Sequence, residues 1–199
     1  MTITVRLVGG LGNQLFQYAA GRALAKQHRT DLWLDTSFLD KGNSHRPRAG
    51  SKSHITRRAY ELHHWSCPAA LVADLKPRRQ DKIVEQPSFS FYKNFFSLGD
   101  DTYLIGYWQG YRYLAGMEQT VKAMFEPLKN PSAETQRLLK VIRDSNAAVM
   151  VHIRRGDYVH LSQAAKFHGT LTLDYYDQAM AWIEKKITKP HFFIFSDDA

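Results

Sequence analysis

The side chains with the clearest chemical potential lie in one segment, HIRRGDY at residues 152–158. It follows the apolar run 147–151, which predicts a buried strand. Arg154 and Arg155 then stand at the carboxyl end of that strand, where a buried charge is costly unless an opposite charge meets it. Because a guanidinium stays charged and presents a planar fork of donors, the pair suits a phosphate or pyrophosphate. A structural ion pair with Asp157 is the alternative.

A glycine-rich turn, GGLGNQ at residues 9–14, is the second candidate site. Glycine lets a backbone approach a ligand closely, and a helix starting here, with Asn13 as its expected N-cap, offers N–H groups to an anion. A dinucleotide fingerprint needs a third glycine where this chain has Leu15, although Asp35 stands near the place of a ribose-binding acid. The pattern predicts either an anion site or a tight turn without a ligand.

Acidic residues follow a last apolar strand in the segment FSDD, residues 195–198. Asp197 and Asp198 would stand at the carboxyl end of that strand, where carboxylates can accept hydrogen bonds from ribose hydroxyls or base N–H groups. Capping of a following helix by Ser196 or Asp197 is the alternative. Because a domain rarely ends where a strand delivers polar groups to a sheet edge, the chain is expected to be the front part of a longer protein.

Two further clusters are expected to be structural. His63, His64 and Cys67 match no common zinc spacing, so surface histidines beside a buried cysteine are the better interpretation. The aromatic residues within 107–113 could stack on a base or a sugar, but such clusters more often form core or a domain seam. We recognise no Walker-type phosphate loop and no serine or cysteine nucleophile with a partnering histidine.

The elements that would position these residues alternate between strands and helices. A strand at 2–8, a helix and a strand at 31–35 form a βαβ unit, which predicts a parallel sheet and an α/β fold. The basic stretch 40–60 interrupts the pattern and is interpreted as a loop, either a solvated surface or a lid. The composition changes near residue 146, where a second βαβ unit begins, so the domains are expected to span 1–145 and 146–199.

Periodicity predicts the remaining elements. Strands are expected at 82–85, 89–95, 102–106, 147–153 and 191–195, and helices at 116–126, 132–145 and 174–187. The helix at 132–145 is expected to start at Pro131-Ser132, and Asp174 is the expected cap of the helix at 174–187.

Composition limits the class of protein and its partners. The formal charge of +8 favours anionic ligands without choosing among nucleotides, nucleic acid and acidic membrane surfaces. Cys67 is the single cysteine, which excludes an internal disulfide framework and favours a reducing compartment. We find neither a signal peptide nor an apolar run of about 20 residues. The expected location is cytoplasmic, with peripheral contact at the inner face of the membrane as a further option.

Four segments together carry a resemblance: VRLVGGLGNQLFQYAAGRALA, GYWQGYRYL, VHIRRGDYV and FFIFSDDA. In this order they resemble the bacterial and animal α-1,2-fucosyltransferases, of the glycosyltransferase family 11 type with its H-x-R-R-G-D-Y motif. The resemblance implies a GT-B-like α/β fold in which two Rossmann-like domains face a cleft, the second being incomplete here. It also implies inverting transfer of L-fucose from GDP-β-L-fucose to the 2-hydroxyl of a terminal galactoside in glycan or surface-polysaccharide synthesis. Neither a metal cofactor nor a nucleic-acid partner is implied.

The resemblance also assigns roles to the motif residues. Arg154 and Arg155 would contact the GDP pyrophosphate, with Arg155 at the leaving group, where fixed cations replace a metal. His152 and Asp157 would shape that site. Asp157 is a candidate general base, although a carboxylate held against two arginines has a low pKa and is a poor base. The implied donor-binding residues are Gly10, Gly12, Asn13, Arg154, Arg155, Ser196, Asp197 and Asp198, and the implied catalytic residues are Arg155, Asp157 and His152.

Two other classes of protein stay open on the residues alone. A nicotinamide-dependent oxidoreductase would use the first βαβ unit, but Leu15 speaks against it. A non-catalytic module that binds nucleotides or polyanions would follow from the charge of +8, and its binding would weaken steeply with salt. The non-catalytic module would leave the arginine pair and the glycine turn unexplained. The acceptor glycan and the oligomeric state are left open.

Overall fold

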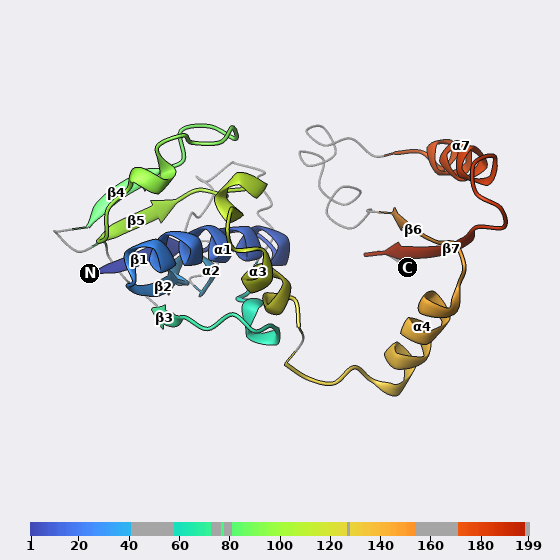
Figure 1. Ribbon diagram of the computed structural model, residues 1–199, viewed down its shortest axis with the longest axis horizontal. Helices are drawn as coiled ribbons and strands as arrows, with labels where there is room; N and C mark the ends of the chain where they lie inside the picture. The colour runs from blue at the N-terminus through green and yellow to red at the C-terminus, as the bar shows by residue number, and fades with distance from the viewer. Residues whose placement is uncertain (41–57, 73–76, 78–80, 127, 154–170, 198–199) are drawn as a thin grey trace, which may run out of the picture. The chain divides into compact units, whose positions relative to one another are not determined.

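The computed structural model describes residues 1–40, 58–72, 77, 81–126, 128–153 and 171–197. They fall into two compact units, the first ending at Asn130 and the second covering, in its described part, residues from Pro131 onward. Each unit is built on a parallel sheet with helices, so the α/β class is confirmed (Figure 1). The domain assignment 1–145 and 146–199 and the GT-B-like arrangement stay predictions.

A five-stranded, wholly parallel sheet organises the first unit, in the order β3-β2-β1-β5-β4. Its strands are β1 (Thr2–Arg6), β2 (Asp31–Asp35), β3 (Ala70–Val72), β4 (Lys82–Glu85) and β5 (Thr102–Ile105). The chain moves outward from β1 to β3 on one side and returns through β4 to β5 on the other. The strand order therefore reverses between β1 and β5, the place where open α/β sheets bind their ligands.

Helix α1 (Leu11–His28) connects β1 to β2 and packs against both strands (Figure 1). Val5 of β1 is fully buried against it. A Cβ added to Gly21 would lie 2.3 Å from Val5 Cγ2 and 2.9 Å from Leu32 Cδ1, so this glycine lets the helix approach the strands closely. In a dinucleotide fingerprint the third glycine has this packing task. In this chain position 15 is Leu15, and Gly21 instead allows the close helix–strand packing.

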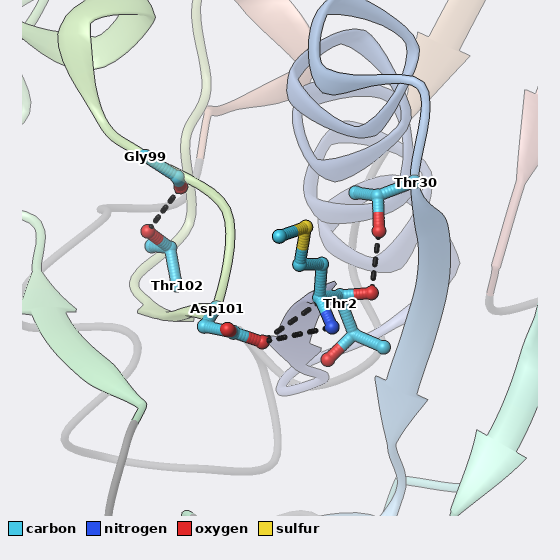
Figure 2. A network of polar contacts seen from close by, with 6 residues as sticks. Thr2, Thr30, Gly99, Asp101 and Thr102 are labelled. Carbon is cyan, nitrogen blue, oxygen red and sulfur yellow. Dashed lines mark hydrogen bonds and ion pairs between the residues drawn. The ribbon is translucent and has the colours of Figure 1, made fainter.

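Polar contacts fasten the amino end of the same sheet (Figure 2). The Asp101 carboxylate accepts a hydrogen bond from the Thr2 backbone N–H at 3.2 Å and pairs with the Met1 ammonium at 3.4 Å. Thr30 Oγ1 donates to the Met1 carbonyl at 2.5 Å. The start of β1 is thus tied to the segments that precede β2 and β5, at the end of the sheet opposite to the glycine turn.

An aromatic cluster completes the core of the first unit. Phe95, Trp108 and Tyr113 are all buried, with the Phe95 centroid 5.2 Å from that of Trp108 and 4.7 Å from that of Tyr113. The prediction that the aromatic residues within 107–113 form core is confirmed for Trp108 and Tyr113. The strand predicted at 89–95 is wrong, because the segment bends and enters a 3-10 turn that points Phe95 into the cluster.

Short elements connect the larger ones in the first unit. They are α2 (Ser37–Asp40), η1 (Leu62–His64), η2 (Phe95–Ser97), η3 (Tyr111–Leu114) and α3 (Glu118–Met124). No helix in the described part of the chain is both long enough and apolar enough to cross a bilayer.

The second unit contains α4 (Ala133–Asp144), β6 (Ala148–Ile153), α7 (Leu173–Glu184) and β7 (His191–Ser196). The predicted start of α4 at Pro131-Ser132 is confirmed, since Ser132 is the N-cap residue and its Oγ accepts a hydrogen bond from Thr135 N at 3.2 Å. The cap predicted for α7 is wrong. Thr172 is the N-cap residue, and Asp174 lies within the first turn, where its charge favours the helix N-terminus.

The strands β6 and β7 pair in parallel, as the second βαβ unit predicted, but they are not buried. Met150 is 68% exposed and Ile194 is 61% exposed. Among the described residues the sheet has these two strands alone, and every buried apolar residue lies at or before Met124. The predicted burial of both strands is therefore wrong in this part of the chain, because the described elements leave one face of the sheet uncovered.

Candidate substrate-binding site

The glycine turn joins β1 to α1 at the carboxyl edge of the sheet. Gly9 has a φ of +80°, and a Cβ there would lie 2.2 Å from the side-chain nitrogen of Asn13. Gly10 is the N-cap residue of α1, and its carbonyl accepts the first helical hydrogen bond from Gln14 N at 3.1 Å. The prediction of Asn13 as N-cap is therefore wrong. Asn13 is the third residue of the helix, and its side chain folds back over Gly9.

The start of α1 is a favourable place for an anion. Its first turn contains no acidic residue and no side chain caps it, while backbone N–H groups at a helix N-terminus carry partial positive charge. Among the described residues, a Cβ on Gly12 would meet no atom within 4 Å beyond the backbone of its own helix, so this position is open. A Cβ on Gly10 would lie 3.6 Å from a guanidinium nitrogen of Arg58, which adds a formal charge.

Arg58 was not among the residues predicted from the sequence. It belongs to the basic stretch 40–60, in which one arginine looks like any other. Its guanidinium lies 3.6 Å from the position that a Cβ on Gly10 would occupy, which brings Arg58 beside the glycine turn from a segment far away in the chain.

A buried glutamine, Gln14, ties the glycine turn to the segment before η1. Its Nε2 donates to the Gly9 carbonyl at 2.9 Å and to the Ala59 carbonyl at 2.8 Å. Its Oε1 accepts from Glu61 N at 3.0 Å. With its amide satisfied and no exposed surface, Gln14 fixes the turn beside the neighbours of Arg58.

A second buried glutamine, Gln17, ties the turn to β5. Its Oε1 accepts from Val8 N at 3.0 Å, and its Nε2 donates to the Gly106 carbonyl at 3.0 Å. The ends of β1 and β5 are thus held together at the point where the strand order reverses.

The segment after β5 forms the other side of this point. Trp108 has a φ of +53°, which is rare for a bulky residue. Gln86 Oε1 holds the backbone there by accepting from Tyr107 N at 2.9 Å and from Trp108 N at 2.8 Å. Gln109 Nε2 then donates to Asn13 Oδ1 at 2.6 Å. Asn13 of α1 and Gln109 after β5 are therefore in contact at the point where the strand order reverses.

Asp35 does not serve as a ribose-binding acid. It is 1% exposed, its Oδ2 accepts a hydrogen bond from the Tyr103 hydroxyl, and its Oδ1 accepts one from Ser37 N at 2.9 Å. Burial, followed by the hydrogen bond to Asp35, raises the pKa of Tyr103 well above its usual range. Both carboxylate oxygens of Asp35 accept hydrogen bonds from within the fold, so this residue is not available to bind a ribose as the dinucleotide interpretation requires.

In the second unit the register places the first residues of two predicted motifs side by side. Ile153 is opposite Ser196, and His152 is opposite Phe195. The carboxyl ends of β6 and β7 therefore coincide, and His152, Ser196 and Asp197 are exposed there. Arg154, Arg155, Asp157 and Asp198 lie outside the described residues.

Within the described ranges no three His, Cys, Asp or Glu side chains gather to hold a metal ion. The interpretation of His63, His64 and Cys67 is confirmed, since both histidines are exposed and the cysteine is buried. Burial raises the pKa of Cys67 to about 11, so at neutral pH the thiol is protonated and is neither a nucleophile nor a ready ligand.

A parallel sheet with a glycine turn and a cationic side chain at its strand reversal defines an α/β protein of the class that binds anionic ligands at the carboxyl ends of its strands. Comparison with known proteins gives the family. The model of glycosyl transferase family 11 matches residues 89–199, and the chain belongs to this family. The resemblance carried by the sequence motifs is thereby confirmed.

Two relatives from Escherichia coli align with nearly the whole chain. An α-1,2-colitosyltransferase is 33% identical over 202 residues, which cover 98% of this chain and 69% of that protein. The O-antigen biosynthesis glycosyltransferase WbnK is 28% identical over 225 residues, covering 96% and 71% respectively. No solved structure matches the chain. The chain is a glycosyltransferase, a class that uses a nucleotide-sugar donor and a glycan acceptor, and the oxidoreductase and non-catalytic interpretations lose their support.

Proposed function

We propose that the enzyme transfers L-fucose from GDP-β-L-fucose to the 2-hydroxyl of a terminal galactoside, with inversion, during synthesis of a surface polysaccharide. The β6–β7 register carries the proposal, because it sets the start of H-x-R-R-G-D-Y beside S-D-D, two segments on which the fucosyltransferase resemblance depends. The relatives' names add support, since one forms an α-1,2 linkage and the other acts in O-antigen biosynthesis.

The proposed chemistry needs fixed cations. Departure of GDP leaves negative charge on its phosphate, and Arg154 and Arg155 would stabilise that charge in place of a metal ion. In the first unit, the backbone at Gly10 and Gly12 and the guanidinium of Arg58 would bind the donor as an anion. Ser196, Asp197 and Asp198 would accept hydrogen bonds from its nucleoside.

A nucleotide-linked colitose is the second candidate donor. One observation favours it: the relative that aligns over 98% of this chain is a colitosyltransferase. The linkage and the roles of the arginines would be the same for both donors.

The test is release of GDP from GDP-fucose in the presence of lactose and a chelator. Arg155→Ala is expected to lower kcat more than about tenfold, because a lost transition-state donor costs several kcal/mol. Arg143→Ala removes an exposed arginine from the last turn of α4 and is the charge-matched control. An unchanged kcat for Arg155→Ala would refute its role. Turnover confined to a colitosyl donor would transfer the proposal to the second candidate.

A further inference from the structure

Two large aromatic side chains stay exposed at the carboxyl edge of the five-stranded sheet. Phe89, in the segment after β4, is 76% exposed, and Tyr107, in the segment after β5, is 37% exposed. Their ring centroids lie 6.3 Å apart and their planes differ by 18°. The two rings therefore lie nearly parallel, as a stacked pair, and both are open to water, where apolar area costs free energy unless a ligand covers it.

The backbone beneath this aromatic surface is held on both sides. Gln86 Oε1 accepts from Tyr107 N at 2.9 Å. On the other side of Phe89, the buried Tyr113 hydroxyl accepts from Tyr92 N at 2.8 Å and lies 3.5 Å from the Ser90 carbonyl, to which it donates. A surface that is already ordered loses little conformational entropy when a ligand binds.

The conformation of Trp108 explains how the surface is presented. With a φ of +53°, Trp108 turns fully into the core while its neighbours Tyr107 and Gln109 stay exposed. Its indole Nε1 is buried without a hydrogen-bond partner among the described residues. Strain and an unsatisfied donor of this kind persist where function requires the local shape.

A side-chain amide lies on the same segment as Tyr107. Gln109, two residues after Tyr107, exposes a side-chain amide that is oriented by its hydrogen bond to Asn13. A β-galactoside presents a face of C–H groups on one side of its ring and hydroxyl groups around its rim. Aromatic rings bind the first kind of surface and amides bind the second.

We propose that the Phe89–Tyr107 aromatic surface binds the terminal galactose of the acceptor, with Gln109 contacting its hydroxyl groups. This inference rests on the proposed transfer to a galactoside. The two substrates would then bind to chemically different surfaces. The guanidinium of Arg58 and the start of α1 at Gly10 lie at the carboxyl end of β1 and suit the anionic donor. The aromatic surface follows β4 and β5 and suits a neutral sugar.

Steady-state kinetics of the full chain test the acceptor role. Phe89→Ala and Tyr107→Ala are expected to raise KM for lactose by about three- to tenfold, the size of a lost aromatic contact, and to leave KM for GDP-fucose unchanged. Tyr111→Ala is the matched control, because that ring is 77% exposed on the same connection but lies outside the pair. Phe89→Trp keeps a ring and is expected to retain the wild-type KM. An unchanged KM for lactose in both alanine variants, or an equal rise in Tyr111→Ala, overturns the proposal.

Binding without turnover separates this inference from the proposed function. Saturation-transfer NMR with methyl β-D-galactoside, irradiating the aromatic protons of the protein, requires neither a donor nor activity. We expect saturation of the sugar ring protons in the wild-type chain and its loss in a folded Phe89→Ala/Tyr107→Ala variant. Saturation that persists in that variant, that is missing from the wild type, or that appears on GDP instead of the galactoside overturns the acceptor assignment.

Discussion

The side-chain amide of Gln109 donates a hydrogen bond of 2.6 Å to Asn13 Oδ1 and so joins the end of β5 to the first turn of α1. The bond crosses the point where the order of the parallel strands reverses. It is exposed, and a hydrogen bond in water adds only about 1 kcal/mol to stability. We therefore interpret it as a contact that positions the glycine turn for the donor.

Removing either partner of this bond should reduce catalysis more than stability. Asn13→Ala and Gln109→Ala are each expected to lower kcat/KM for the donor by about tenfold, which equals about 1.4 kcal/mol. Kinetics at saturating lactose leave out the proposed acceptor contact of Gln109. Under that condition the two residues share one interaction, so the double variant should be little worse than either single variant. Steady-state kinetics with a melting curve for each variant provide the check.

Gln27→Ala is the control for this pair. Gln27 also makes an exposed hydrogen bond, of 2.7 Å to the Phe96 carbonyl, but near the opposite end of α1. Losses that add fully in the double variant, or an equal loss in Gln27→Ala, would contradict the positioning role.

Two glycines of α1 should respond to alanine in opposite ways. At Gly12 a Cβ meets no atom within 4 Å, so Gly12→Ala should keep or slightly raise Tm while weakening donor binding through the added methyl group. At Gly21 a Cβ would lie 2.3 Å from Val5 Cγ2, so Gly21→Ala should lower stability by about 1–3 kcal/mol through overpacking. Thermal unfolding and GDP titration distinguish them, and a Gly12→Ala variant with wild-type GDP affinity would remove Gly12 from the donor site.

Arg58 should contribute to donor affinity through its charge. Arg58→Ala is expected to weaken GDP binding by about tenfold to a hundredfold, in line with a charge-assisted hydrogen bond, and Arg58→Lys should recover part of it. Lys26→Ala removes one positive charge from the last turn of α1 and should leave GDP affinity intact. Calorimetric titration at two salt concentrations measures both, and equal effects in the two variants would reduce Arg58 to a general surface charge.

The first βαβ unit was predictable from the sequence because its signals are local. The β-branched alternation of β1, the bounds of β2 and the helical periodicity of α1 lie within short windows of the chain. The placement of β5 beside β1 has no such signal, because adjacency in a sheet depends on contacts between distant segments. Arg58 and Gln109 were missed for the same reason, since each gains its role from a partner far away in sequence.

Errors at element ends have physical causes too. Asn13 has the right residue type for an N-cap, but its side chain is used by Gln109, and the backbone of Gly10 takes the cap position instead. Phe95 has strand propensity, yet the aromatic cluster with Trp108 and Tyr113 draws it into a turn. In both cases tertiary contacts outweigh a local preference.

Stability should fall at alkaline pH through buried groups of the first unit. Burial raises the pKa of Cys67 from 9.0 to about 11 and that of Tyr18 from 10.0 to about 12. In the unfolded chain both groups lose their protons at lower pH than in the folded chain, so their contribution to the free energy of unfolding is full below about pH 9 and is lost progressively above it. Melting curves between pH 8 and 11 should show this decrease. Cys67→Ala should remove its first part, and an unaltered pH profile in that variant would contradict the assignment.

The identity of the product tests the central claim most directly. GDP-β-L-fucose and lactose are incubated with the enzyme in a chelator, and the linkage and anomeric configuration of the product are determined by NMR. We expect α-L-fucose on the 2-hydroxyl of the galactose, with one GDP released for each sugar transferred. No product with this donor, a β-linked product, or transfer to another hydroxyl group would contradict it.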